Sequence, residues 1–217
     1  MDMIGSDSIA ILPTASISIR NRDVEFPFRP DSDFFYLTGY PEPEAVVVLI
    51  PDREEGECIL FCRERDEKME AWHGRRSGLE GAIKIYAADD AFPIEDMDDI
   101  LPGLIEGHER IYYNMGSDQN FDQRVLGWVN QIRDKVRTGA TAPDEFISLN
   151  HFLHEMRLYK SRYEIKLMRK AAEISTKAHK RAMKNCRPGM YEYQLEGELI
   201  SEFIQNGARY TAYPPIV

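Results

Sequence analysis

Residues 45–62 read AVVVLIPDREEGECILFC, and this stretch decides the fold of the first half of the chain. Its first part, 45–50, is a continuous apolar run rich in β-branched residues, which is typical of a strand buried on both faces. The polar segment 51–57 contains a glycine and favours a turn. The second apolar run, 58–62, then reads as a partner strand. We therefore predict a buried β-hairpin.

Further strands and helices are expected on both sides of this hairpin. An acidic segment at 88–99 is expected to open a short helix, and short apolar runs predict three more strands, at 9–12, 83–86 and 110–113. Residues 118–137 are typical of a helix with one apolar face, because apolar residues recur every three or four positions: Phe121, Val125, Trp128, Ile132 and Val136. Ser117 or Asp118 can cap this helix, and Gly139 lies just past its end.

After Pro143 the pattern changes to helices. Mixed strands with covering helices predict an α/β N-terminal domain over residues 1–150, with a mixed sheet flanked by helices. Ser161 followed three residues later by Glu164 is the signature of a capping box, in which each residue satisfies a backbone N–H of the other. A long helix is expected to start there, and Pro188 is expected to stop the chain from continuing it.

A second helix is predicted over 193–206, where leucine and phenylalanine recur at helical spacing, with Gly207 as its left-handed end. The following residues, 209–217 (RYTAYPPIV), read as a strand. A helix pair that leads into a strand is the start of a domain. Residues 151–217 are therefore interpreted as an incomplete second domain, which we expect to bury its apolar faces poorly.

Composition and charge narrow the class of protein. Lys and Arg number 27 against 37 Asp and Glu, so the net charge is −10, which argues against nucleic-acid partners and against binding to anionic membranes. The first residues lack the basic and long apolar regions of a signal peptide, and the longest apolar run, AVVVLI, is far too short to span a bilayer. Three cysteines do not make a disulfide scaffold, so a reducing, cytoplasmic setting is expected.

The sequence lacks several short motifs that are typical of catalytic, nucleotide-binding and metal-binding sites. No G-x-S-x-G elbow, P-loop or G-x-G-x-x-G is present. HFLHE at 151–155 does not have the order of a zinc-protease motif, and the acidic run 95–99 lacks the spacing of a calcium loop, so we interpret both as solvated surface. Cys58 and Cys62 would share one side of a strand, where two small buried residues are favoured over a metal pair. No metal-ligating residue and no catalytic residue is assigned.

Three aromatic stretches remain open on local grounds: 20–45, 71–78 and 206–217. The first packs many aromatics among prolines and charges and can be a clamp over a core. In the second, Trp72 can plug a turn or present its indole face to a ligand. In the third, alternation on a strand would place neighbouring side chains on opposite faces.

Together with their neighbours, these stretches resemble the aminopeptidase P (Xaa-Pro aminopeptidase) family over nearly the whole chain. The motifs that carry the resemblance follow in one order along the sequence: RNRDVEFPFRPDSDFFYLTGYPEPEAVVVLI (20–50), AWHGRR (71–76), HEMRLYKSRYEIKLMRKAAEI (154–174), CRPGMYEYQLEGEL (186–199) and NGARYTAYPPIV (206–217). The resemblance implies a creatinase-N-like α/β domain over 1–150, followed at 151–217 by the first helices and strand of an α+β pita-bread domain.

The family resemblance also implies an activity and a cofactor. Its members are hydrolases that release the N-terminal residue from peptides with proline second, and they use two divalent ions, usually manganese, held by two Asp, one His and two Glu. In the family these ligands all lie downstream of the strand that RYTAYPPIV resembles. We therefore expect this chain to hold no metal, to be inactive alone, and to be either a fragment or an incomplete sequence that is cut at both ends.

Three positions match family residues near the substrate. Asp23 aligns with an aspartate whose charge suits a peptide's N-terminal ammonium. Trp72 matches a tryptophan on a loop that reaches a neighbouring subunit's active site, where an indole suits a prolyl ring, so a homo-oligomer is expected. Tyr213 matches a tyrosine of the pocket wall. A structural role is an open alternative for each, and a prolidase-type dipeptidase or a non-catalytic peptide- or protein-binding relative is the alternative for the whole protein.

Overall fold

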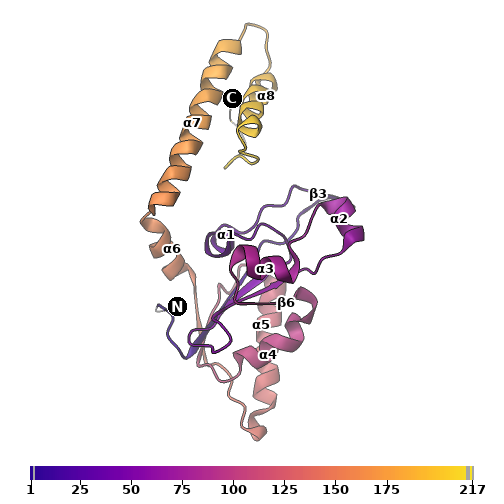
Figure 1. The fold of residues 1–217 in the computed structure, drawn as a ribbon, viewed down its shortest axis with the longest axis vertical. Coiled ribbons are helices and arrows are strands. Elements are labelled where there is room, and N and C mark those ends of the chain that lie inside the picture. The colour runs from indigo at the N-terminus through magenta and orange to yellow at the C-terminus, as the bar shows by residue number, and fades with distance from the viewer. Residues whose placement is uncertain (2, 214–215, 217) are drawn as a thin grey trace. The chain divides into compact units, whose positions relative to one another are not determined.

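The computed structural model describes residues 1, 3–213 and 216 (Figure 1). The chain divides into two compact units, Met1–Glu155 and Met156–Val217, which are described separately below and are termed the sheet unit and the helical unit. Among the described residues, no helix is long and apolar enough to cross a membrane.

A six-stranded sheet organises the sheet unit, in the order β6-β5-β4-β1-β7-β8. β1 pairs with β4 in antiparallel and with β7 in parallel orientation, and β4 and β5 form the antiparallel hairpin that the sequence predicted. β6 and β8 extend the two edges in parallel orientation. The strands are β1 (Ser8–Pro13), β4 (Val46–Leu49), β5 (Cys58–Cys62), β6 (Asp90–Pro93), β7 (Arg110–Tyr112) and β8 (Glu145–Ile147).

Helices cover both faces of this sheet. Successive strand residues point to opposite sides, so the strands contribute apolar side chains to a layer on each face. Ile9 and Ile11 of β1 pack in one apolar layer with α4 (Met97–Ile105) and α5 (Gln119–Asp134). The residue between them, Ala10, belongs to a second layer on the other face. That layer includes side chains of three further helices, α1 (Ser32–Thr38), α3 (Gly78–Tyr86) and α6 (Asn150–Leu158). The predicted mixed sheet flanked by helices is therefore confirmed.

The sheet unit also contains several smaller elements. The strands β2 (Ile19–Asn21) and β3 (Val24–Glu25) form a separate two-stranded sheet, and the short helix α2 (Glu67–His73) follows β5. One 3-10 turn, η1 (Ile94–Asp96), precedes α4, and another, η2 (Val136–Thr138), follows α5.

Three sequence predictions for the sheet unit are wrong. Helices were expected directly after Pro143, but residues 145–147 form the edge strand β8 through pairing with β7, and the first helix after it is α6. The expected strand 83–86 is the last part of α3, whereas the strand that pairs with β5 lies farther along, at β6. A short apolar run is compatible with either a helix or a strand, and here the tertiary pairing with β5 selects a less apolar segment as the strand. Val136 is 65% exposed rather than buried, because α5 ends two residues earlier and the chain turns into η2.

The helical unit consists of α7 (Arg162–Asn185) and α8 (Glu192–Gln205), which pack side by side as a helical hairpin (Figure 1). The predicted capping box is present: Glu164 N–H donates to Ser161 Oγ at 3.2 Å, and Ser161 N–H donates to the Glu164 carboxylate at 2.7 Å. Gly207 has the predicted left-handed backbone, with φ of 83°.

The predicted strand at 209–217 is not formed by its described residues. Positions 209–213 adopt bends and irregular backbone, and residues 214, 215 and 217 lie outside the described part of the chain. A strand requires a neighbouring strand to accept and donate its backbone hydrogen bonds, and no such neighbour exists among the described residues of the helical unit.

Candidate functional site

The three expected substrate residues lie on three different exposed segments. Asp23 and Trp72 belong to the sheet unit, and Tyr213 belongs to the helical unit. Asp23 sits in the turn between β2 and β3, directly after Arg22, whose φ of 53° makes the tight reversal possible. Its side chain is exposed at the tip of the hairpin, where the carboxylate is accessible to a cationic group.

Trp72 lies on α2, a helix with well-defined ends. The Asp66 carboxylate accepts from the backbone N–H groups of the first turn, at 2.9 Å and 3.2 Å, and Gly74, with φ of 87°, ends the helix. Trp72 is 85% exposed, so most of the apolar surface of its indole is in contact with water. Such exposure is unusual, because tryptophan is ordinarily well buried. We term residues 63–77, which join β5 to α3 and carry α2, the Trp72 loop.

The Trp72 loop is tied together by charged side chains. Arg65 donates two hydrogen bonds to the carboxylate of Glu70, at 3.0 Å and 3.1 Å, and these bonds hold the pKa of Glu70 below its ordinary value. Arg76 donates to the backbone carbonyl of Glu64 at 3.3 Å, so the two strands of the loop are bonded to each other near its base.

A group of buried polar side chains lies beneath the base of this loop, and sequence reasoning missed it. The side chains of Glu42 and Arg63 are only 12% and 13% exposed, and they form an ion pair at 3.5 Å. Tyr40 is fully buried, and its burial, followed by the nearby Cys62 and Glu42, raises the pKa of its hydroxyl above the ordinary value. The only indication in the sequence was the presence of acidic residues in GYPEPEA (39–45) and of basic residues in CRER (62–65). Charged residues of this kind ordinarily lie on the protein surface.

Tyr213 lines an apolar groove of about 400 Å³ within the helical unit. The groove runs between α7, α8 and the segment after α8, and its lining includes Ile174, Leu199, Phe203, Tyr210, Tyr213 and Ile216. The Tyr213 side chain is 71% exposed. An aromatic wall of this kind suits an apolar or aromatic group, and the single imidazole at its edge is His179.

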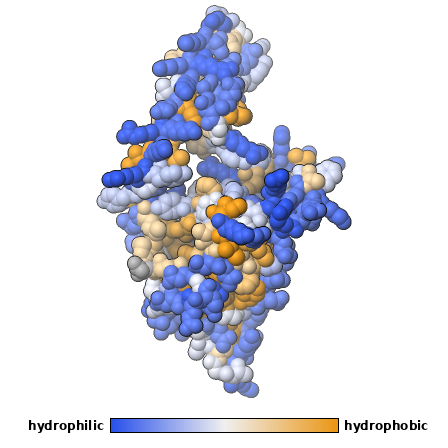
Figure 2. Space-filling view, viewed as in Figure 1, coloured by the Kyte–Doolittle hydropathy of each residue, from blue (hydrophilic) through white to orange (hydrophobic). Residues whose placement is uncertain are grey.

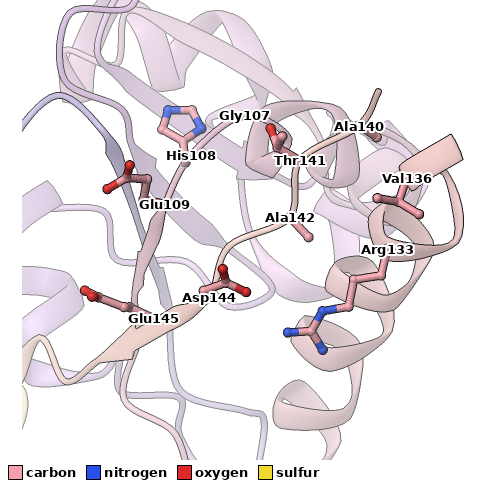
Figure 3. A pocket seen from close by; sticks show the side chains of 10 residues that line it. All are labelled: Gly107, His108, Glu109, Arg133, Val136, Ala140, Thr141, Ala142, Asp144 and Glu145. Atoms are coloured by element: carbon pink, nitrogen blue, oxygen red, sulfur yellow. The ribbon is translucent and has the colours of Figure 1, made fainter. Parts of the chain in front are cut away.

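A second cavity, of about 770 Å³, lies elsewhere in the sheet unit and contains none of the expected residues. Figure 3 shows His108 and Glu109, just before β7, on one side and Arg133 of α5 on the other. Its charged groups are Glu109, Arg133, Asp144 and Glu145, of both signs.

The side chains considered as metal ligands in the sequence do not converge. Among the described residues, no group of three His, Cys, Asp or Glu side chains is placed to hold a metal ion. His151 and His154 are exposed on α6, and Asp98 of the acidic run accepts from the Trp128 indole N–H at 2.8 Å. The thiol of Cys62 is buried in the core, where burial raises its pKa to about 11. A pair of divalent ions therefore does not fit this part of the protein.

Two family models match the chain in succession. The aminopeptidase P N-terminal domain matches residues 1–112, and metallopeptidase family M24 matches residues 166–217. The chain belongs to the aminopeptidase P family. Asp23 and Trp72 lie in the first match of this aminopeptidase P chain, and Tyr213 lies in the second.

Individual relatives agree with this assignment. The chain is 42% identical over 211 residues to "Xaa-Pro aminopeptidase" of Escherichia coli, covering 97% of the chain and 48% of that protein. The solved structure of Pseudomonas aeruginosa aminopeptidase PepP is 59% identical with a TM-score of 0.95, covering 98% of the chain and 48% of that structure. Proline aminopeptidase P II from Yersinia pestis is 43% identical with a TM-score of 0.92, covering 97% and 49%. The chain thus spans about half the length of the relatives it matches.

Proposed function

We propose that this chain is the N-terminal part of a dimetal Xaa-Pro aminopeptidase, which releases the N-terminal residue from peptides with proline second. The observation that carries the proposal is the succession of the two family matches, an aminopeptidase P N-terminal domain at 1–112 followed by the start of an M24 peptidase at 166–217. Two relatives that match along both regions, from Escherichia coli and Haemophilus influenzae, bear the name Xaa-Pro aminopeptidase.

In this proposal the metal ions are bound by a part of the enzyme outside these residues. M24 peptidases are metallopeptidases by description, yet the described residues offer no group of three potential ligands. We expect two divalent ions, manganese first, in the full-length protein and none in residues 1–217. The 217-residue chain alone is accordingly expected to be inactive.

Substrate contacts are the proposed contribution of this half. The exposed carboxylate of Asp23 attracts the N-terminal ammonium of a peptide, and the aromatic groove that contains Tyr213 receives an apolar part of it. Trp72 offers a free indole face to the prolyl ring, because a ring stacked on an indole removes apolar surface of both partners from water.

The exposure of Trp72 also supports a homo-oligomer. An indole that is 85% exposed is stabilised when a second surface covers it. We propose that this surface belongs to the substrate-binding region of a neighbouring copy, so that each Trp72 loop completes the site of another subunit.

The test is hydrolysis by the full-length protein, purified with Mn²⁺, of a tripeptide with proline second, with the matched alanine tripeptide as control. We expect release of the first residue from the proline peptide only, loss of activity on dialysis against a chelator, and no activity from residues 1–217. Cleavage confined to Xaa-Pro dipeptides would establish the prolidase-type alternative. Peptide binding without turnover would establish the non-catalytic alternative.

A further inference from the structure

The two ends of the Trp72 loop converge on one carboxylate, that of Glu42, which comes from a distant segment before β4. Its Oε1 accepts a hydrogen bond from the backbone N–H of Ser77, at the end of the loop, at 2.7 Å. Its Oε2 lies 3.5 Å from the guanidinium of Arg63, at the start of the loop. Glu42 therefore bridges the first and the last residues of the loop that carries Trp72.

This bridge is formed where water screens it little. The side chains of Glu42 and Arg63 are 12% and 13% exposed, so their attraction acts at a lower effective dielectric than on the open surface. Arg63 also lies 3.7 Å from the carboxylate of Glu44, which is 55% exposed, so removal of the Glu42 charge leaves the buried guanidinium with only a partner that water screens more strongly. Detachment of the loop at its start separates this pair, and detachment at its end breaks the hydrogen bond from Ser77 to Glu42.

Close packing reinforces the same junction. Gly78, the first residue of α3, has φ of 63°, and a Cβ atom at this position would lie 2.6 Å from Cγ of Arg65. The glycine therefore lets the end of the loop approach its beginning. Arg65 in turn is held by Glu70 of α2, so the base of the loop is connected directly to the helix that presents Trp72.

We infer that Glu42 is a positioning residue, which fixes the place and direction in which the Trp72 loop presents its indole. This inference rests on the proposed function, in which Trp72 contacts the prolyl ring of the substrate. Glu42 itself is nearly buried and reaches the substrate only through the loop. It determines how well Trp72 meets a substrate and leaves the chemical step to other groups.

The first experiment measures the loop directly and does not depend on activity. Trypsin can cut the loop at Lys68, Arg75 and Arg76 once it detaches. In Glu42→Ala, which removes both contacts, we expect the rate of cleavage within the loop to rise about tenfold or more, since cleavage follows the population of the open form. Glu42→Gln, which keeps an acceptor for Ser77 but loses the charge that faces Arg63, is expected to give a smaller increase.

A matched control is Glu57→Gln. Glu57 also accepts a backbone N–H, that of Asp52 at 2.8 Å, but it lies in the β4–β5 turn. It should leave cleavage of the Trp72 loop unchanged. Equal cleavage rates in Glu42→Gln, Glu42→Ala and the unmodified protein would overturn the inference, whatever the enzyme proves to hydrolyse.

The second experiment uses the full-length enzyme. Glu42→Gln should raise KM for the proline tripeptide several-fold with little change in kcat, and thermal unfolding should show that the variant is folded. In a Trp72→Ala background the same change should have almost no further effect on KM, because the residue through which it acts is gone. Independent, additive effects of the two substitutions would overturn the positioning role, whereas absence of Xaa-Pro hydrolysis in the unmodified enzyme would overturn the proposed function alone.

Discussion

The sheet unit buries far more of its apolar residues than the helical unit does. In the sheet unit, two apolar layers enclose the sheet, and many side chains of both layers are completely inaccessible to water. In the helical unit, Ile174 and Ala178 of α7 are the only buried apolar residues among those described. The poor burial expected for the second domain is confirmed for this unit.

The difference follows from geometry. A sheet covered on both faces encloses its strands, whereas two helices can bury only the seam between them. The outer faces of the pair remain apolar in places, and hydrophobic residues reach the surface of both units (Figure 2). The exposed large hydrophobic residues of α7 and α8 are Tyr163, Ile165, Leu167, Met168, Met183, Tyr193 and Ile204. Such a pattern indicates a surface that packs against further protein.

The sharpest test of this comparison is the same substitution in one helix of each unit. Leu101 of α4 is 0% exposed and Leu167 of α7 is 50% exposed. Leu101→Ala should lower the free energy of unfolding by about 2–5 kcal/mol, because it removes buried methyl groups and leaves a cavity. Leu167→Ala in the 217-residue chain should change it by less than about 0.5 kcal/mol. Urea unfolding followed by circular dichroism measures both, and equal losses would refute the difference between the units.

A smaller effect is expected from the polar contact that holds α4 to α5. The Trp128 indole N–H donates to Asp98 at 2.8 Å, and Trp128 is 2% exposed. Asp98→Ala should cost about 1–3 kcal/mol, because the N–H of a buried ring is left without its acceptor and the ion pair of Asp98 with Arg124, at 3.0 Å, is lost. Asp99→Ala, on the same exposed turn of α4, is the control for the shared helix-terminal charge effect. Similar unfolding midpoints for the two variants would contradict this account.

The parts of the fold that could be predicted are those in which local pattern and tertiary structure agree. The hairpin of β4 and β5 follows from an unbroken β-branched run, and α5 and α7 follow from helical periodicity together with a side-chain cap. β6, with the sequence DAFP, has little strand propensity of its own and is formed by pairing with β5. No local reading of the sequence could supply that partner.

Some residues of the candidate site could likewise be predicted from the sequence, and others could not. Asp23, Trp72 and Tyr213 were reached by resemblance, and the structure places all three on exposed segments, which leaves their roles as proposals. Glu42 was not singled out, because its contact with Ser77 joins residues 35 positions apart. A contact of that separation depends on the path of the chain between its partners, which a pattern in the sequence does not specify.

Within the helical unit, the N-terminal cap of α7 should carry a measurable local effect. Ser161→Ala removes the acceptor of the Glu164 backbone N–H and should destabilise the first turn by about 1 kcal/mol. Amide hydrogen exchange of that turn should accelerate by about fivefold. Ser175→Ala, the same change inside α7, should not accelerate exchange, since alanine has the higher helix propensity. Acceleration in both variants would show that general fraying, rather than the cap, limits protection.

The smallest expected effect is a pH dependence of the same cap. Hydrogen bonds from the backbone and side chain of Ser161 hold the pKa of Glu164 below its ordinary value of 4.5. Because the ionised form is favoured in the helix, its contribution is fully present above pH 4.5 and is lost as the pH falls through the lowered pKa. The amide resonance of Ser161, whose N–H donates to this carboxylate, should follow that titration in an NMR experiment. Glu164→Gln, which keeps an acceptor but cannot titrate, should flatten the curve. An unchanged curve in that variant would assign the pH dependence to a different group.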